Sequence, residues 1–220
     1  MTHPALLFDL DGTLTDPRVG IVGCLRYALD RLGRPVPDED VLAACIGPPL
    51  RRSFAALLDT HDSALIEEAT RLYRERFSVV GLFENCVYDG VPGMLERLRG
   101  RRLLVATSKM AAFAERIVVH FGLRSYFSGV YGAEPNGRFD DKAELIAHLL
   151  RREGLAPEAT VMIGDRAFDI VAARTNGLRA VGVLWGYGSE RELREAGAER
   201  LCATPVELPA VIAQLSVQGR

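Results

Sequence analysis

Apolar residues form short, uninterrupted runs along this chain, a pattern typical of parallel strands that are buried on both faces. We predict such strands at residues 5–10, 103–106, 130–131, 161–163 and 180–184. The segments between and after them place apolar residues at helical spacing, which predicts helices at residues 92–98, 113–121, 142–152, 169–175 and 205–215. This repetition of strand and helix predicts an α/β fold with a Rossmann-like parallel sheet.

The alternation is interrupted once, between residues 17 and 85. No clear strand occurs there, and Pro, Gly and Asp residues separate helical patterns at residues 19–32, 38–46, 50–58 and 63–77. The segment directly follows the first strand, and open α/β sheets carry their active sites at the carboxyl ends of their strands. We therefore predict a core domain of residues 1–16 and 86–220 and an inserted α-helical cap domain of residues 17–85.

Composition and charge restrict the class of function. Of the 220 residues, 48% are hydrophobic and 25% are charged, which suits a folded chain with a buried core. The net charge of −2 gives no support for a nucleic-acid partner or for an acidic membrane surface, and no apolar run reaches the ~18 residues of a membrane span. Because the N-terminus lacks the basic region of a targeting signal, we expect a cytoplasmic protein, either a monomer or a homodimer.

The strongest chemical signal is the sequence DLDGTLT, which begins with Asp9 at the end of the first predicted strand. The carboxylates of Asp9 and Asp11 repel each other unless a cation compensates them, and Mg²⁺ binds both carboxylate and phosphate oxygens. Gly12 permits a tight turn whose backbone N–H groups, including that of Thr13, can face an anion. Taken alone, the Asp-Gly pair is also typical of an ordinary turn.

A second acidic motif, GDRAFD, follows the predicted strand at residues 161–163. Asp165 at the strand end and Asp169 one helical turn later can share a face, and with Asp9 and Asp11 they would complete a metal site. The alternative is structural, with Asp165 as a helix N-cap and Asp169 as a favourable acid in the first turn.

Hydroxyl groups and lysines supply the remaining signals. Thr107 and Ser108 follow the strand at residues 103–106, where a hydroxyl can donate to a phosphate oxygen or cap a helix. Lys109 and Lys142 are the only lysines among the 27 basic Lys and Arg side chains, which favours roles that arginine does not fill. Lys142 begins a predicted helix, where its charge opposes the helix dipole, so we predict that it neutralises a phosphate and a carboxylate.

In their order along the chain, DLDGTLT, VATS, the lone Lys142 and IGDRAFD resemble the motifs of the haloacid dehalogenase superfamily. The helical insertion and the stretches GPPLRRSF, YDGVPGMLERL and VLWGYGS are similar to its phosphoglycolate phosphatase-like branch. This resemblance implies a parallel-sheet core with a helical cap, and a Mg²⁺-dependent phosphatase that forms a covalent aspartyl-phosphate.

The resemblance also implies a role for each matching residue. Asp9 matches the nucleophile and Asp11 the general acid and base. Thr107 matches the phosphate-binding hydroxyl, with Ser108 and Lys109 beside it, and Lys142 matches the charge that steadies Asp9 and the phosphoryl group. The implied Mg²⁺ ligands are Asp9, the backbone carbonyl of Asp11, Asp165 and Asp169.

Substrate choice is expected to depend on the predicted cap. The bend at Gly47 can point the loop at residues 47–52 (GPPLRR) into the cleft, where Arg51 or Arg52 would contact a substrate anion. A plain turn with solvated arginines is the alternative. The presence of Asp11 argues against a dehalogenase, and the lack of lysine in residues 17–85 argues against a Schiff-base hydrolase.

The predicted substrate is a small phosphorylated metabolite, such as a phosphoglycolate-like compound, a nucleotide or a sugar phosphate. A phosphohexomutase of the same fold and a catalytically silent binding protein are the alternatives. A receiver domain, which also uses acidic strand ends and a lysine, is disfavoured by the large insertion after the first strand.

Overall fold

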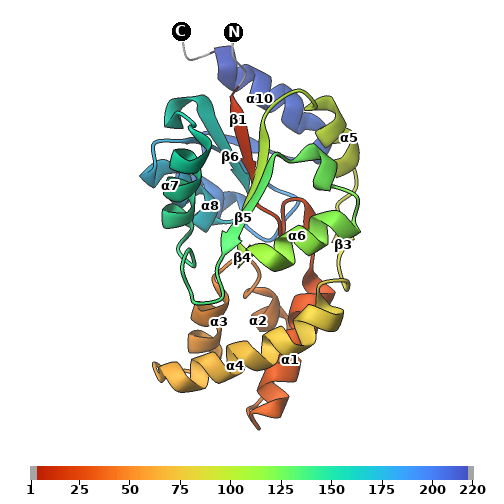
Figure 1. Ribbon diagram of the computed structural model, residues 1–220, viewed down its shortest axis with the longest axis vertical. Helices are drawn as coiled ribbons and strands as arrows, with labels where there is room; N and C mark the ends of the chain where they lie inside the picture. Colours follow the sequence, from red (N-terminus) through yellow and green to blue (C-terminus); the bar gives the residue numbers. More distant parts are fainter. Residues whose placement is uncertain (1–3, 218–220) are drawn as a thin grey trace.

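The predicted apolar runs are neighbouring strands of one parallel sheet in the computed structural model, which describes residues 4–217 (Figure 1). The strand order is β5-β4-β1-β6-β7-β8, and each adjacent pair is parallel. The six strands are β1 (Ala5–Phe8), β4 (Leu103–Met110), β5 (Gly129–Ala133), β6 (Thr160–Gly164), β7 (Arg179–Val183) and β8 (Arg200–Cys202). The order places β1 between β4 and β6, so three motif-bearing strand ends are adjacent.

Helices cover both faces of this sheet, because successive strand residues point to opposite sides. Leu6 and Phe8 of β1 belong to one apolar cluster, and Leu7 between them belongs to another. The first face is covered by α5 (Val91–Arg97), α6 (Ala111–His120) and α10 (Leu208–Val217). The second is covered by α7 (Lys142–Glu153), α8 (Ala167–Thr175) and α9 (Glu190–Ala196). The predicted α/β fold is confirmed.

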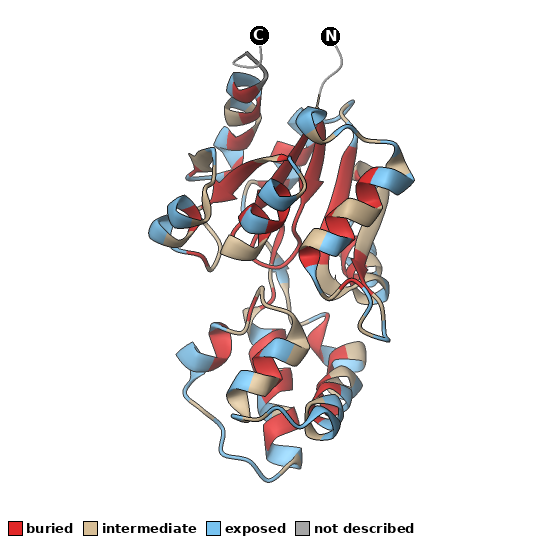
Figure 2. Ribbon diagram, turned by 90° about the vertical axis from the view of Figure 1, so that its left-hand side faces the viewer, coloured by how far each residue is buried: buried red, intermediate tan, exposed pale blue. Residues whose placement is uncertain are grey.

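Four helices lie beyond the carboxyl ends of the strands, at the bottom of Figure 1. They are α1 (Arg18–Arg31), α2 (Glu39–Ala43), α3 (Leu50–Leu57) and α4 (Ser63–Arg76), and a π-helical turn at Phe77–Gly81 follows α4. Leu25, Phe54 and Phe77 are buried in this segment, and Figure 2 shows that its helices carry both buried and exposed residues. These side chains join the apolar cluster of the sheet, so the two parts share a continuous core.

The chain enters and leaves the helical segment at one place. The short strands β2 (Thr15–Asp16) and β3 (Cys86–Val87) pair antiparallel there, with Thr15 opposite Val87 and Asp16 opposite Cys86. Two adjacent strands suit a hinge between two bodies, and the division into core and cap domains stays a prediction.

Two elements of the core were not predicted, and one predicted helix is shorter. Helix α9 is mostly charged and buries only Leu193 among its residues, and β8 is a three-residue edge strand, so neither has a strong apolar pattern. Helix α2 ends at Ala43 instead of residue 46, because the next turns use i→i−3 hydrogen bonds before two prolines. Within the described residues, no helix combines the length and apolar character needed to cross a membrane.

Candidate active site

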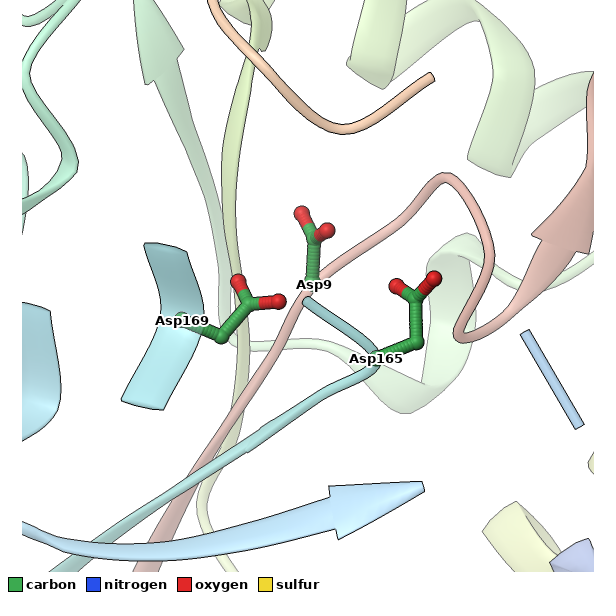
Figure 3. Close-up of side chains that lie close together, drawn as sticks. All are labelled: Asp9, Asp165 and Asp169. Atoms are coloured by element: carbon green, nitrogen blue, oxygen red, sulfur yellow. The ribbon is translucent and has the colours of Figure 1, made fainter. Parts of the chain in front are cut away.

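Three buried aspartates meet at the carboxyl ends of β1 and β6. Asp9 directly follows β1, Asp165 directly follows β6, and Asp169 lies in the first turn of α8. Each offers one carboxylate oxygen to a group whose atoms all lie within 4.8 Å of one another, and Figure 3 shows Asp9 between the other two side chains. The exposed fractions are only 2% for Asp9 and 0% for Asp165 and Asp169. Adjacent parallel strands thus bring together residues that are 156 positions apart in the sequence (165 − 9).

The turn after Asp9 is built against Asp165. Gly12 has a φ of +85°, and a Cβ atom there would lie 2.2 Å from Oδ2 of Asp165, so only glycine fits. The hydroxyl of Thr13 donates to Oδ1 of Asp165 at 3.2 Å, and the backbone N–H of Tyr187 donates to Oδ2 at 2.8 Å. Gly12 and Thr13 thus shape and hold the carboxylate of Asp165, and their predicted contact with substrate stays a prediction.

The start of α8 holds Asp169 in place. The backbone N–H of Arg166 donates to Oδ2 of Asp169 at 3.0 Å, which makes Arg166 the N-cap residue and Asp169 its capping partner. The alternative interpretation of Asp165 as the N-cap is therefore wrong, whereas Asp169 does serve as a first-turn acid. The side chain of Asp165 is left facing Asp9.

Lys142 lies between two of the three aspartates. Its Nζ atom is 3.0 Å from Oδ1 of Asp9 and 2.5 Å from Oδ1 of Asp169. The carboxylate of Asp141 caps α7 by accepting from the N–H groups of Ala143 and Glu144, at 2.7 and 3.1 Å, and so fixes the helix end that carries Lys142. Burial would lower the pKa of Lys142, but Asp169 and Asp9 outweigh it and raise that pKa.

One ammonium does not balance three buried carboxylates. Burial raises the pKa of Asp165 well above its usual range, and the nearby Asp169 and Asp9 raise it further. Burial also raises the pKa of Asp169 to about 6, although Lys142 opposes this shift. A cluster of carboxylate oxygens with excess negative charge is the donor set that a hard divalent cation prefers, so these residues fit a Mg²⁺ ion.

Asp11 points away from this cluster, toward the helical segment. Its Oδ2 atom lies 2.7 Å from Nζ of Lys109, and that ammonium is 4.3 Å from the centre of the Phe77 ring. Burial raises the pKa of Asp11, and Lys109 opposes the shift. Oδ1 of Asp11 and Oγ of Ser108 are buried without a hydrogen-bond partner among the described residues. The predicted metal ligand from Asp11 is its backbone carbonyl, and this stays a prediction.

These groups line a cavity between the sheet and the helical segment. The cavity measures about 70 Å³. The sheet side contributes Asp9, Asp11, Thr107, Ser108 and Lys109. The helical side contributes Ile21, Leu25, Cys45, Gly47, Pro48, Leu50, Arg51, Tyr73, Arg74 and Phe77. Thr107 is 2% exposed, and its hydroxyl accepts from the N–H of Lys109 at 3.3 Å.

The two residues predicted from the 47–52 loop do line this cavity. Gly47 has a φ of +104°, and the guanidinium of Arg51 is bound to Glu67, to Asp140 at 2.8 Å and to the carbonyl of Pro135 at 3.3 Å. Arg51 thus already has protein partners, and its contact with substrate stays a prediction. The neighbouring Arg52 lies over the ring of Phe168 and is not part of the cavity wall.

Sequence reasoning missed Tyr73 and Arg74, which line the cavity from α4. Arg74 donates one hydrogen bond of 3.4 Å to the carbonyl of Pro135 and has no carboxylate within ion-pair distance among the described residues. Burial lowers the pKa of Arg74, and the positive charge of Arg51 lowers it further. The only signal in the sequence was helical periodicity, which does not show that this face of α4 covers an active site.

Comparison with known proteins agrees with this geometry. The model of the haloacid dehalogenase-like hydrolase family matches residues 6–183. The chain is 48% identical over 216 residues to 5′-nucleotidase of Pseudomonas aeruginosa, with 96% of each chain covered. It is 42% identical to tyrosine-protein kinase PtkA of Mycobacterium tuberculosis over 83% of this chain, but it spans only 62% of that protein.

Solved structures give the same assignment. The crystal structure of a predicted phosphatase from Clostridium acetobutylicum superimposes with a TM-score of 0.93 and 36% identity, covering 97% of this chain and all of that one. The fold is therefore shared with a solved structure of this class. The chain belongs to the haloacid dehalogenase-like hydrolase family of enzymes, as its sequence motifs predicted.

Proposed function

We propose that this protein is a Mg²⁺-dependent phosphatase that hydrolyses a small phosphomonoester through an aspartyl-phosphate on Asp9. The observation that carries this proposal is the placement of Asp9, whose carboxylate lies beside Lys142 in the acidic cluster and also lines the cavity. A buried carboxylate in the wall of a cavity, with a fixed ammonium beside it, is suited to attack a phosphorus atom.

In the first step, an Asp9 oxygen attacks the phosphorus atom and the bond from phosphorus to the leaving oxygen breaks. The alkoxide that leaves takes a proton from Asp11, whose raised pKa favours the protonated acid once substrate displaces Lys109. Thr107 and Ser108 line the same cavity and supply hydroxyl donors to the phosphoryl oxygens. Lys142 compensates the negative charge on Asp9 and on the transferred group.

In the second step, water attacks the phosphorus atom of the aspartyl-phosphate and Asp9 leaves as a carboxylate. Asp11, now ionised, accepts the proton of the attacking water and is ready for the next cycle. Asp9, Asp165, Asp169 and the carbonyl of Asp11 would hold Mg²⁺, which supplies charge compensation for the phosphoryl oxygens.

The helical side of the cavity is proposed to select the leaving group. It presents the apolar side chains of Ile21, Leu25 and Phe77 together with Arg74, a cation that has no carboxylate partner among the described residues. Nucleoside 5′-monophosphates are the first candidates, because the relative at 48% identity is a 5′-nucleotidase. For this substrate class we propose that the helical segment opens to admit the nucleoside and acts as a cap.

Phosphate release from a panel of nucleotides, sugar phosphates and phosphoglycolate tests the proposal, with and without Mg²⁺. We expect release that needs Mg²⁺ and falls by more than about 10³-fold in Asp9→Asn. Activity that survives Asp9→Asn would mean that another group is the nucleophile. Rearrangement of a sugar phosphate without phosphate release would favour a phosphohexomutase, and no turnover of any compound would favour a binding protein.

We also propose a cytoplasmic location, which fractionation of the host cell would test.

A further inference from the structure

Arg166 connects the acidic cluster to the helical segment. It stands directly after Asp165, and its own backbone N–H donates to Oδ2 of Asp169 at 3.0 Å. Its side chain, which is 15% exposed, extends away from the cluster toward the loop between α2 and α3. Arg166 therefore contacts the predicted metal ligand Asp169 through its backbone, and it contacts the loop between α2 and α3 through its side chain.

The guanidinium of Arg166 is held at both ends. Its Nε atom lies 2.9 Å from Oε1 of Glu192, and the same carboxylate oxygen accepts from the N–H of Ala167 at 2.8 Å. Its Nη1 atom donates to the backbone carbonyl of Ile46 at 2.5 Å. Because guanidinium donors have a fixed planar geometry, the anchor at Glu192 sets the direction in which Nη1 reaches Ile46.

Gly47, the residue after Ile46, packs on the stem of the same side chain. With a φ of +104°, it presents no Cβ atom, and a Cβ placed there would lie 2.7 Å from Cγ of Arg166. Gly47 and Pro48 then continue into the cavity wall that faces Asp9 and Asp11. The position of Arg166 thus bears directly on how this wall sits over the nucleophile.

We propose that Arg166 is a positioning residue that couples loading of the metal site to docking of the loop at residues 46–49 over Asp9. This inference rests on the proposed Mg²⁺ site. Without a cation, the excess negative charge of Asp9, Asp165 and Asp169 opposes their close approach, and we expect this repulsion to weaken the turn that carries Arg166. A cation that orders this turn favours the one arrangement in which Arg166 reaches both Glu192 and Ile46, so metal binding and loop docking stabilise each other.

Amide hydrogen exchange of the peptide at residues 42–50, measured with Mg²⁺ alone and with EDTA, tests the coupling without substrate. In the wild type we expect Mg²⁺ to slow exchange of this peptide about tenfold. In Arg166→Met the effect of Mg²⁺ should fall below about twofold. By the same linkage, the Kd of Mg²⁺ from calorimetric titration should rise by a similar factor, about tenfold.

Arg52→Met is the matched control. Arg52 also bridges the helical segment and α8, with its guanidinium 5.1 Å from the centre of the Phe168 ring, but it does not touch the acidic residues. This variant should keep the full effect of Mg²⁺ on exchange. If Arg166→Met and Arg52→Met lose the effect of Mg²⁺ on exchange equally, the proposal is overturned. Any contact between the helical segment and the sheet domain would then be enough to transmit this effect.

Two further variants cover the remaining outcomes. Arg166→Lys keeps the positive charge but cannot span Glu192 and Ile46 together, so it should behave like Arg166→Met. If Arg166→Met does not fold, Glu192→Gln removes the charged anchor and should weaken the coupling in a folded protein. A wild type that binds Mg²⁺ and hydrolyses substrate, but shows no Mg²⁺ effect on the 42–50 peptide, would refute the coupling and leave the proposed phosphatase intact.

Discussion

The two sides of the cavity are built from different kinds of contact. On the sheet side, Asp9 and Asp169 are paired with Lys142 at distances of 3.0 Å or less. On the helical side, apolar side chains surround Arg74, which has one weak hydrogen bond and no carboxylate partner among the described residues. The sheet side thus has its charges paired, whereas on the helical side Arg51 is paired and Arg74 keeps a charge that we propose for substrate contact.

This difference separates the reaction from the choice of substrate. Reacting groups at adjacent strand ends keep their geometry because the hydrogen bonds of a parallel sheet fix it. The helical side joins the sheet through the short strands β2 and β3, so we expect changes in the part of its wall away from Arg166 to affect Asp9 less. Changes on the sheet side should therefore alter catalysis and stability together, and changes on the helical side should alter substrate binding.

Replacing Lys142 should have the largest effect. In Lys142→Met, Asp9 and Asp169 remain buried without their counter-ion, so kcat/KM should fall by about 10³-fold or more. The free energy of unfolding of the metal-free protein should fall by about 3–5 kcal/mol, because a buried charge loses its partner. Phosphate-release kinetics and urea unfolding in EDTA measure the two effects.

Lys109→Met is the comparison for this variant. Lys109 contacts Asp11 and Phe77 on the cavity side and does not touch the acidic cluster. We expect a smaller loss of activity, about 10–100-fold, and a loss of stability below about 2 kcal/mol. Similar losses of stability in both lysine variants would contradict the contrast between the two sides.

Acidic pH should stabilise the metal-free protein through Asp169. Its pKa is raised from the usual 3.8 to about 6, mainly by burial, so the folded state holds a proton that the unfolded state releases. This contribution is complete below about pH 4 and is lost as the pH rises through 6; it amounts to at most ~3 kcal/mol. Urea unfolding in EDTA between pH 4 and 7 should show this decline in the wild type. Asp169→Asn should make this decline less steep, and an unchanged slope in that variant would assign the effect to another group.

Arg74→Met should change substrate binding with little change in chemistry. If Arg74 contacts the leaving group, KM should rise about 10–100-fold, worth ~1.4–2.7 kcal/mol, while kcat stays within about threefold. Arg71→Met is the matched control, since Arg71 lies one turn away on α4, pairs with Glu68 and Glu75, and is exposed. A fall in kcat with an unchanged KM would instead assign Arg74 to the reaction itself.

The same contrast explains how much the sequence could predict. Asp9, Asp11, Asp165 and Lys142 were found because each lies beside a short apolar strand or at the start of a helix, and strand order then brings them together. Arg74 and Arg166 were not found, because their roles depend on which helix face meets which loop across the cavity. No local pattern in the chain encodes such a contact.

The role of the loop after β7 could be predicted only in part from the sequence. Its sequence, VLWGYGS, was noticed only as part of a resemblance, yet it supports the site directly. The indole N–H of Trp185 donates to the carbonyl of Thr13 at 3.0 Å, and the hydroxyl of Tyr187 donates to Asp16 at the end of β2. The small glycines at 186 and 188 let this loop approach Gly12 and Asp165, a contact that only the folded structure reveals.

Tyr187→Phe should have the smallest effect of these variants. It tests whether the junction with the helical segment can be weakened without changing the acidic cluster. It removes the hydroxyl bond to Asp16 at the junction with the helical segment, but it keeps the backbone N–H that donates to Asp165 at 2.8 Å. The free energy of unfolding should fall by about 1 kcal/mol, and Mg²⁺ affinity should stay within about twofold. Urea unfolding and calorimetric titration measure these quantities. A large loss of Mg²⁺ affinity would show that the junction and the acidic cluster are one rigid unit, and the distinction between a fixed sheet side and an adjustable helical side would then fail.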